Sequence, residues 1–332
     1  MPQSFAVLGA GGWGTAVAVH LAKLGHDVRL WGARAESVER LRSTRQNGRL
    51  LPGVTIPDSV TITGEPAEAA RTANVWIVAI PTAFLREALG RFRSIANADT
   101  ACLSLTKGIE NGTFQRPTEI VADVLGVRTL AALSGPSHAE EMARGLPASV
   151  VVASENVEFA TAIQSAFGNE RFRVYTNRDL VGVELAGALK NVLGIAAGIC
   201  DGLGFGDNAK AALLTRGIVE MTRFGTARGA EAATFAGLAG IGDLIATCFS
   251  KHGRNRRVGE RLGRGEKLAD ILAGPQVAEG VWTAKSVREW GQANALATPI
   301  MTAVYDVLYE AKSPLAAVQE LMARQMREES LC

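Results

Sequence analysis

Short apolar runs alternate with segments of helical spacing through the first half of the chain. Most runs are nearly continuous rather than alternating, which is typical of strands that helices cover on both faces. Between them apolar residues recur with a helical period, for example from Trp13 to Leu24 and from Val157 to Phe167. The pattern predicts a doubly wound parallel sheet, with a mixed edge left open as an alternative. The expected strands are Phe5 to Leu8, Asp27 to Trp31, Val60 to Thr63, Asn74 to Ile80, Thr100 to Thr106, Thr129 to Ser134, Ala148 to Ala153 and Arg171 to Thr176.

The strand pattern stops after Asp179, and the apolar residues then follow helical spacing. Asp207 is expected to cap one long helix, and residues 299–326 are expected to form two helices around Pro314. We therefore predict an α/β domain over residues 1–180 and an all-helical domain over residues 181–332. The apolar face of the first helix of this second domain carries Leu185, Leu189, Val192, Leu193 and Ala196.

Length and charge narrow the possible partners. The chain has 332 residues, 47% of them apolar, which is enough for a hydrophobic core in each of two domains. Lys and Arg number 35 against 33 Asp and Glu, so the formal net charge is only +2. Because this charge creates no extended field of one sign, neither nucleic acid nor an acidic membrane is an expected partner.

Cysteine usage and hydropathy indicate the compartment. Cys102, Cys200, Cys248 and Cys332 form no Cys-x-x-Cys pair, which is typical of reduced thiols. The N-terminus lacks a charged region before its short apolar run, and no stretch approaches the ~18 uninterrupted apolar residues of a spanning helix. We therefore expect a cytoplasmic protein without membrane insertion.

A glycine-rich motif, G-A-G-G-W-G, follows the first strand and opens the first helix. Gly9 permits a tight turn, Gly11 lets the backbone approach a pyrophosphate, and Gly14 allows close helix packing. The helix N-terminus would then face the phosphates of a dinucleotide. A purely structural turn remains the alternative.

The end of the second strand bears on the choice between NAD and NADP. An acid about 20 residues beyond the glycines would hold the ribose 2′-hydroxyl of NAD, but the chain has Gly32-Ala33-Arg34 there. The guanidinium of Arg34 could pair with a 2′-phosphate, so we expect NADP(H) to be accepted. In the alternative, Arg34 is a solvated charge at a helix start and Glu36 reaches the ribose.

Polar residues follow two strands at the edge where α/β sheets bind ligands. Lys107 follows the strand that ends at Thr106, and Gly135-Pro136-Ser137 follows the strand that ends at Ser134. These residues bring an ammonium and a hydroxyl to the edge that carries the phosphate loop. In the alternative, Lys107 is an ordinary lysine on a surface loop without a functional role.

Lys190-Asn191 interrupts a helix that otherwise carries Ala, Leu, Val and Gly. Lysine is almost never fully buried without a partner, and burial or a neighbouring cation lowers the pKa of its ammonium toward neutrality. Such a lysine can act as a general acid or base. Snorkelling of Lys190 to a helix end is the alternative.

A third polar segment contains Asp243, Thr247, Arg254 and Asn255. If a helix begins at Asp243, Thr247 lies one turn along on the same face, although Asp243 could instead be only an N-cap. Arg254 and Asn255 beside a glycine suit phosphate recognition, since a guanidinium grips two oxygens in one plane. The aromatic residues that a nucleic-acid patch needs for base stacking are missing.

The four histidines show no metal-ligand spacing, so no metal site is expected. Of the four histidines, only His138 lies close in sequence to the end of a strand that is predicted to bind a ligand. It is a less favoured candidate for proton transfer than a buried lysine.

Taken together, these motifs resemble the soluble NAD(P)-dependent glycerol-3-phosphate dehydrogenases in their bacterial form. The resemblance runs nearly end to end, and its later segments are long and unusual. It rests on G-A-G-G-W-G-T at 9–15, L-W-G at 30–32, T-K-G-I-E at 106–110, S-G-P-S-H-A at 134–139, V-E-L-A-G-A-L-K-N at 183–191, D-G-L-G-F-G-D-N-A-K-A-A-L at 201–213, G-I-G-D-L at 240–244 and R-N-R-R at 254–257.

The resemblance implies a Rossmann-type domain, an all-helical substrate domain, and interconversion of sn-glycerol 3-phosphate and dihydroxyacetone phosphate. Lys190 matches the proton acceptor of the family, with Lys107, Asp243 and Thr247 as further catalytic residues. The implied substrate contacts are Lys107, Gly135, Ser137, Lys190, Asn191, Asp243, Gly253, Arg254 and Asn255. The implied cofactor contacts are Gly9, Gly11, Gly12, Trp13, Gly14, Ala33, Arg34, Lys107, Ala139, Arg254, Val277 and Glu279.

Two positions depart from the family pattern. Gly253 stands where many relatives have serine, so no side-chain hydroxyl can contact the phosphate there, and Ala33 replaces a residue that is often polar. The resemblance also implies a role in supplying glycerol 3-phosphate for phospholipid synthesis. A homodimer is expected from base rates alone.

Reduction of a ketone requires one acid beside the nicotinamide, and Lys190 is the expected acid. A nearby Lys107 would lower the pKa of Lys190 by repulsion, and Asp243 would oppose that shift. Two alternatives stay open. One is a β-hydroxyacid or phosphogluconate-type dehydrogenase, which pairs its lysine with an asparagine four positions later rather than adjacent to it. The other is an NAD(P)-binding sensor without turnover, which would not need Lys107, Lys190 and Asp243 together.

Overall fold

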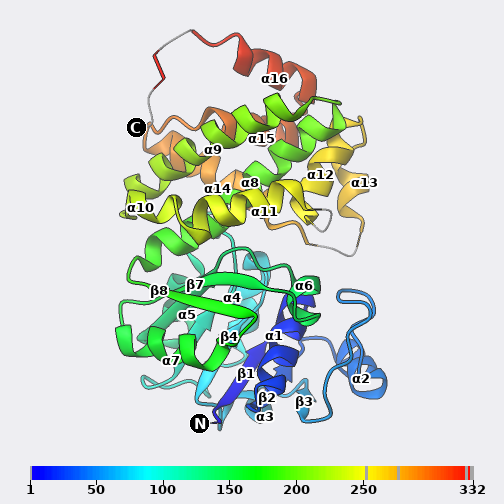
Figure 1. Ribbon diagram of the computed structural model, residues 1–332, viewed down its shortest axis with the longest axis vertical. Coiled ribbons are helices and arrows are strands. Elements are labelled where there is room, and N and C mark those ends of the chain that lie inside the picture. Colours follow the sequence, from blue (N-terminus) through cyan, green and yellow to red (C-terminus); the bar gives the residue numbers. More distant parts are fainter. Residues whose placement is uncertain (1, 251–252, 275–276, 326–327, 330–332) are drawn as a thin grey trace. The chain divides into compact units, whose positions relative to one another are not determined.

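The computed structural model describes residues 2–250, 253–274, 277–325 and 328–329. The chain divides into two compact units (Figure 1). Unit 1 comprises Met1–Thr106 and Pro117–Leu180, and unit 2 comprises Lys107–Arg116 and Val181–Cys332.

The segment Lys107–Arg116 groups with unit 2, although the sequence pattern places it in the first domain. Its contacts explain the grouping. The hydroxyl of Ser286 donates to the carbonyl of Ile109 at 3.0 Å, and Nη1 of Arg116 lies 2.5 Å from Oε2 of Glu184. The loop that follows Thr106 therefore packs within unit 2 and places Lys107 there.

Unit 1 is built on an eight-stranded sheet of order β3-β2-β1-β4-β5-β6-β7-β8. β7 runs antiparallel to β6, and every other neighbouring pair is parallel. The predicted doubly wound Rossmann-type sheet is confirmed, in the form with a mixed edge. The strands are β1 (Ser4–Leu8), β2 (Asp27–Trp31), β3 (Val60–Thr63), β4 (Val75–Val78), β5 (Ala101–Ser104), β6 (Thr129–Ser134), β7 (Ala148–Ala153) and β8 (Phe172–Asn177).

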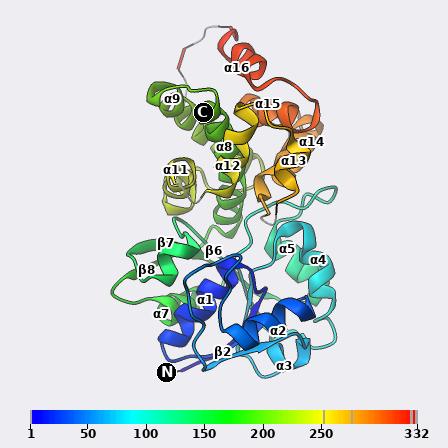
Figure 2. The same ribbon diagram turned by 90° about the vertical axis from the view of Figure 1, so that its right-hand side faces the viewer.

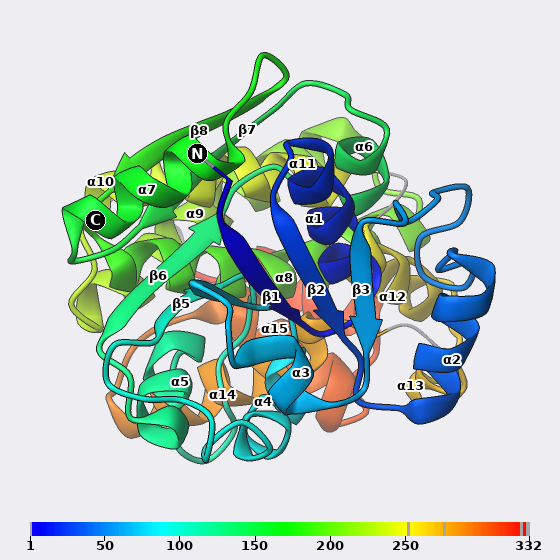
Figure 3. The ribbon, with the colours of Figure 1, turned by 90° about the horizontal axis from the view of Figure 1, so that it is seen from below.

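Helices cover both faces of this sheet (Figures 2 and 3). One apolar core lies between the sheet and α1, α2, α6 and α7, and a second lies between the sheet and α3, α4 and α5. Burial on both faces accounts for the nearly continuous apolar strands. The helices are α1 (Gly12–Lys23), α2 (Ala35–Thr44), α3 (Pro66–Ala70), α4 (Thr82–Gly90), α5 (Pro117–Leu125), α6 (Ala139–Ala143) and α7 (Val157–Phe167).

Unit 2 is helical, as predicted for the C-terminal domain. Asp207 is not the cap of α9: the N-cap is Gly206, and Asp207 is the first helical residue, where its charge still favours the helix dipole. The elements are α8 (Leu180–Gly202), α9 (Asp207–Ala227), α10 (Ala232–Phe235), the π-helical turn η1 (Leu238–Gly242), α11 (Asp243–Phe249), α12 (Arg254–Gly263), α13 (Leu268–Leu272), α14 (Glu279–Ala293), α15 (Pro299–Tyr309) and α16 (Pro314–Met322).

Two stretches, Leu180–Gly202 and Ala232–Phe249, are long and apolar enough to cross a membrane by length and composition alone. The most apolar window of the first is 94% buried inside the fold, and that of the second is 44% buried. A core helix passes the same test, so these stretches are weak evidence for a membrane span. The second stretch also carries Asp243 and is interrupted by η1.

Candidate active site

Two lysines and one aspartate form a buried ionic cluster in unit 2. Nζ of Lys190, on α8, lies 3.1 Å from Oδ1 of Asp243, the first residue of α11. Nζ of Lys107 lies 2.6 Å from Oδ2 of the same carboxylate. The three side chains are 10%, 4% and 17% exposed for Lys190, Asp243 and Lys107. One carboxylate thus holds two ammonium groups in a place that water barely reaches.

Burial sets the protonation behaviour of this cluster. Desolvation lowers the pKa of Lys190 to about 8, because the attraction of Asp243 offsets it only in part and Lys107 adds repulsion. Burial works to raise the pKa of Asp243, but the two ammonium charges and their hydrogen bonds outweigh it and hold that pKa below its usual value. Lys190 therefore titrates close to neutral pH beside a carboxylate that stays ionised.

The start of α11 places a second partner for Lys190. Nζ of Lys190 donates to Oγ1 of Thr247 at 2.6 Å, and Thr247 lies one helical turn after Asp243 on the same face. The helix begins after a π-helical turn, a feature that is frequent at functional sites. Both polar partners of the lysine therefore come from one short helix.

A chain of amides connects the neighbouring elements of unit 2. Nδ2 of Asn191 donates to the carbonyl of Lys107 at 2.9 Å, and Nδ2 of Asn255 donates to Oδ1 of Asn191 at 2.9 Å. The amide N–H of Gly280 donates to Oδ1 of Asn255 at 3.0 Å. The adjacent Glu279 is half-buried as the first residue of α14. Gly280 was not among the predicted site residues, because no local pattern shows a backbone donor aimed at a distant side chain.

The first turn of α12 carries the predicted phosphate contacts. Arg254 is exposed and Asn255 is buried, while Gly253 is the N-cap of the helix. A Cβ atom at Gly253 would lie 2.8 Å from the carbonyl oxygen of Thr247, so this packing leaves no room for a side chain. The predicted cofactor contact Val277 is half-buried and precedes α14.

The glycine-rich loop of unit 1 has the features of an anion cradle. Gly9 has φ of 120°, and a Cβ at Gly14 would lie 3.1 Å from the carbonyl carbon of Gly9. A Cβ at Gly12 would meet the carbonyl of Leu50, whereas space around Gly11, the N-cap of α1, is open. Because no side chain caps α1, its first amides are available to a phosphate.

One further donor lies beside this loop. Nε1 of Trp13 is buried and has no hydrogen-bond partner among the residues that the structure describes. Buried donors are normally satisfied, so an orphaned indole N–H indicates a place for a ligand acceptor. The loop residues therefore fit the pyrophosphate end of a dinucleotide.

The end of β2 presents cations to solvent. Ala33 and Arg34 are exposed, and Arg34 is the N-cap of α2 without a side-chain capping bond. Nη1 of Arg91 donates to the carbonyl of Ala33 at 3.2 Å. The side chain of Arg34 thus makes no capping bond to its own helix.

The end of β6 carries Gly135, Ser137 and Ala139 in unit 1. Gly135 has φ of 120°, and the hydroxyl of Ser137 donates to its carbonyl at 2.9 Å. Ala139 is the first residue of α6, with His138 as the N-cap. Ser134 was not among the predicted site residues, and its buried hydroxyl has no hydrogen-bond partner in the described part of the chain.

The structure brings six of the predicted residues into direct contact within unit 2: Lys107, Lys190, Asn191, Asp243, Thr247 and Asn255. The residues from Gly9 to Arg34 and from Gly135 to Ala139 belong to unit 1.

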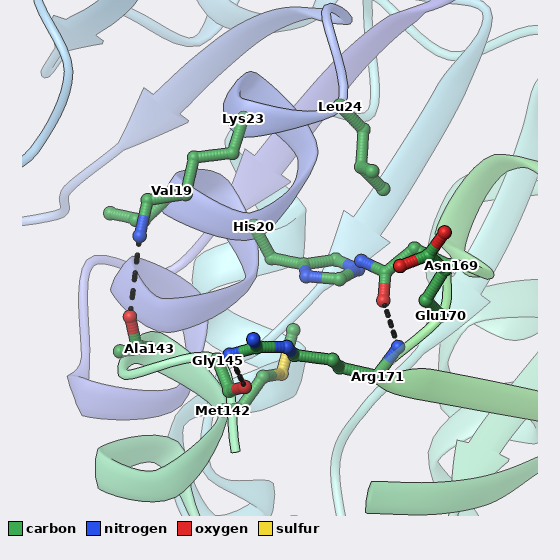
Figure 4. Close-up of a pocket in the computed structure, with 10 residues that line it drawn as sticks. All are labelled: Val19, His20, Lys23, Leu24, Met142, Ala143, Gly145, Asn169, Glu170 and Arg171. Atoms are coloured by element: carbon green, nitrogen blue, oxygen red, sulfur yellow. Dashed lines mark hydrogen bonds between the residues drawn. The ribbon is translucent and has the colours of Figure 1, made fainter. Parts of the chain in front are cut away.

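A cavity of about 300 Å³ in unit 1 lies apart from these residues (Figure 4). Val19 is the first residue of α1 that lines the cavity. At 1.5 Å per residue, it lies roughly 10 Å along the helix axis from Gly12. Lys23 and Arg171 donate to the carbonyls of Ala143 and Gly145 at its rim, both at 3.4 Å. None of the predicted site residues lines this cavity.

Models of one family match both parts of the chain. The N-terminal model of NAD-dependent glycerol-3-phosphate dehydrogenase matches residues 4–160, and its C-terminal model matches residues 179–319.

Individual relatives match over nearly the whole length. The chain is 47% identical to glycerol-3-phosphate dehydrogenase NAD(P)+ 2 of Salinibacter ruber, covering 99% of this chain and 97% of the relative. It is 48% identical to the glycerol-3-phosphate dehydrogenase NAD(P)+ of Geobacillus thermodenitrificans, covering 98% and 96%. A crystal structure of glycerol-3-phosphate dehydrogenase from Coxiella burnetii superposes with a TM-score of 0.94 at 38% identity, covering 97% and 99%.

Proposed function

Because the chain belongs to the NAD-dependent glycerol-3-phosphate dehydrogenase family, we propose that it interconverts sn-glycerol 3-phosphate and dihydroxyacetone phosphate with NAD(P)(H), and that Lys190 carries the proton. The observation that supports this role most directly is the contact of the buried Lys190 with Asp243 and Thr247, in which the pKa of the lysine falls to about 8. A group that titrates near the working pH is the most effective general acid or base.

The nicotinamide, when bound, supplies or accepts the hydride at C2 of the substrate. In ketone reduction, protonated Lys190 donates a proton to the C2 oxygen as the hydroxyl forms. In alcohol oxidation, neutral Lys190 accepts the hydroxyl proton. Asp243 stabilises the ammonium form between turnovers, and Thr247 fixes the direction of Nζ by accepting its hydrogen bond.

The substrate phosphate serves as a handle remote from the reacting carbon. Arg254 and Asn255 are proposed to bind it, with Lys107, Ser137 and the backbone at Gly135 as further contacts. Binding free energy from the phosphate holds C2 in the reactive position, which raises the rate by orientation.

The cofactor is proposed to lie along the glycine-rich loop of unit 1. The first turn of α1 would hold the pyrophosphate, with the orphaned indole N–H of Trp13 as one more donor. Arg34 would pair with the 2′-phosphate of NADP(H). Ala139, Val277 and Glu279 remain proposed contacts.

The biological setting forms part of the same proposal. We infer a cytoplasmic homodimer without nucleic-acid or metal partners, which supplies glycerol 3-phosphate for phospholipid synthesis. These points are supported by the family resemblance, the near-zero net charge and the commonness of two-fold dimers.

One assay separates this proposal from its alternatives. The absorbance of NADPH is followed in three reactions. NADPH is mixed with dihydroxyacetone phosphate, or with no second substrate, and its loss is recorded. NADP+ is mixed with β-hydroxyacids or phosphogluconate, and formation of NADPH is recorded. Turnover only with the triose phosphate is expected. Turnover only with hydroxyacids would favour a β-hydroxyacid or phosphogluconate-type dehydrogenase, and binding of NADPH without turnover would favour a sensor.

A further inference from the structure

A second ionic cluster lies in unit 2, and neither the proton transfer nor the proposed substrate contacts use it. Asp201, near the end of α8, accepts from Nε of Arg256 at 2.6 Å through Oδ2. Its other oxygen forms an ion pair with Nζ of Lys210 on α9. The side chains of Lys210, Asp201 and Arg256 are only 10%, 15% and 22% exposed. Buried charges need such partners, so the three groups depend on one another.

The residues of this cluster lie on or against α8, α11 and α12, the helices that carry Lys190, Asp243 and Asn255. Figures 1 and 2 show where these helices lie in unit 2. Asp201 lies on α8, which also carries Lys190 and Asn191. Arg256 lies on α12, directly after Asn255. The ammonium of Lys210 lies 5.0 Å from the ring centroid of Phe249, the last residue of α11. The carboxylate of Asp201 on α8 therefore pairs with Arg256 on α12 and with Lys210, whose ammonium lies beside the end of α11.

The backbones of α8 and α12 pack closely beside the cluster. A Cβ atom at Gly198 of α8 would lie 2.8 Å from the carbonyl carbon of Arg256. A Cβ at Gly259 of α12 would lie 2.8 Å from the carbonyl carbon of Ile195. Glycines permit this approach, but they hold no side chain that could fix how α12 turns or slides on α8. The directional bond from Arg256 to Asp201 adds such a restraint to the one that the bond from Asn255 to Asn191 provides between the same two helices.

We propose that Asp201 is a positioning residue for substrate binding, which acts by holding Arg256 and thereby the first turn of α12. The inference rests on the proposed function, in which Arg254 and Asn255 bind the substrate phosphate. Loss of the restraint would let this turn move relative to α8 and misalign Arg254 and Asn255 with the phosphate, which weakens their hydrogen bonds to it. Because Asp201 does not contact Lys190, proton transfer itself would be preserved.

The test uses the variants Asp201→Asn and Arg256→Lys in the full chain. Each is assayed for kcat and KM with dihydroxyacetone phosphate and for the competitive inhibition constant of inorganic phosphate. We expect KM and the inhibition constant each to rise about tenfold or more while kcat stays within roughly threefold, the pattern of lost uniform binding. The double variant should be no worse than the weaker-binding single variant, since both changes break one interaction.

The matched control is Glu266→Gln, which breaks another acid–arginine pair of α12. Glu266 contacts Arg261 at 2.6 Å and is 42% exposed, so its loss should leave KM and the inhibition constant within twofold of the wild type. The pH dependence of kcat should also be unchanged in Asp201→Asn, because the ammonium of Lys190 keeps its surroundings.

The outcomes separate this inference from the proposed function. A folded variant of either residue with wild-type KM and phosphate inhibition would overturn the positioning role, as would a fall in kcat with unchanged KM. If Asp201→Asn does not fold, Arg256→Lys decides, since it keeps a positive charge beside Asp201 but lacks the planar guanidinium whose Nε–H donates to that carboxylate. Absence of turnover in the wild type would instead reject the proposed function.

Discussion

Nζ of Lys190 lies 3.1 Å from the carboxylate of Asp243 inside the helical unit, and neither side chain is more than 10% exposed. A charge pair removed from water in this way is sensitive to each partner. The attraction of Asp243 keeps Lys190 protonated at higher pH than burial alone would allow, and the repulsion of Lys107 works in the opposite direction. The protonation of one amine is therefore adjusted by two neighbours of opposite charge.

Replacement of this amine should remove most of the activity. For Lys190→Ala we expect kcat for dihydroxyacetone phosphate to fall at least ~100-fold, the lower end of general acid–base effects. The control is Lys285→Ala, a lysine of α14 whose side chain is 43% exposed. Steady-state kinetics at saturating NADPH checks both variants. Near-normal turnover of Lys190→Ala would rule out the assigned role.

The pH dependence should report the ionisation of Lys190. Ketone reduction needs the protonated amine, so kcat/KM for dihydroxyacetone phosphate should fall as pH rises through about 8. Alcohol oxidation needs the neutral amine, so kcat/KM for sn-glycerol 3-phosphate should rise through the same pH. Profiles measured in both directions from pH 6 to 10 check the sign, and a limb of the same sense in both directions would contradict the assignment.

Removal of the carboxylate charge should move this limb. In Asp243→Asn the attraction that raises the pKa of Lys190 is lost while burial and Lys107 still lower it, so the limb should shift below pH 8. In Lys107→Met the repulsion is lost, and the limb should shift above pH 8. The two variants serve as controls for each other. Shifts in the same direction would show that another group titrates.

The fold follows from the sequence where burial alone decides it. Asp27–Trp31, Val60–Thr63, Thr129–Ser134 and Ala148–Ala153 are predicted to the residue, because each is rich in apolar and β-branched residues and is bounded by glycine, proline or polar residues. The strands predicted to end at Ile80 and Thr106 end at Val78 and Ser104, where their paired register stops, although the predicted run continues for two residues beyond each of them.

Strand direction and distant contacts lie beyond such patterns. A continuous apolar run reads the same in either direction, so the antiparallel pairing of β7 with β6 was not determined by it. Lys190 was predictable because a lysine in an apolar helix is anomalous. The bonds that link Asn191 to Asn255, 64 positions away, and Asp201 to Arg256 depend on how α8 and α12 pack, which residue spacing does not encode.

Cofactor preference should depend on Arg34. Arg34→Ala removes the exposed guanidinium at the end of β2, and we expect kcat/KM for NADPH to fall on the order of tenfold while that for NADH changes less than twofold. Arg40→Ala, whose side chain is 51% exposed on the same helix, is the control. Equilibrium binding of NADP+ and NAD+ by titration calorimetry gives a second readout. An equal loss for both cofactors would show that Arg34 does not read the 2′-phosphate.

Stability should depend on pH through Glu220, a buried carboxyl of α9. It accepts hydrogen bonds from the amides of Ile300 and Met301 at the start of α15, yet burial raises its pKa from 4.5 to about 7 despite these bonds and the charges of Arg223 and Arg324. Between these pH values the native chain binds more protons at this carboxyl than the unfolded chain, so its contribution to the free energy of unfolding falls as pH rises.

Glu220→Gln removes this titration. The difference in the free energy of unfolding, variant minus wild type, should therefore increase from pH 5 to pH 8. The increase should reach up to ~3 kcal/mol, at about 1.4 kcal/mol per pKa unit. Urea unfolding at several pH values in this range measures the difference. Glu320→Gln, whose side chain is 64% exposed, should show no such trend. A difference that stays constant with pH would mean that Glu220 is already ionised in the native chain at pH 5, with the amides at the start of α15 outweighing the effect of burial.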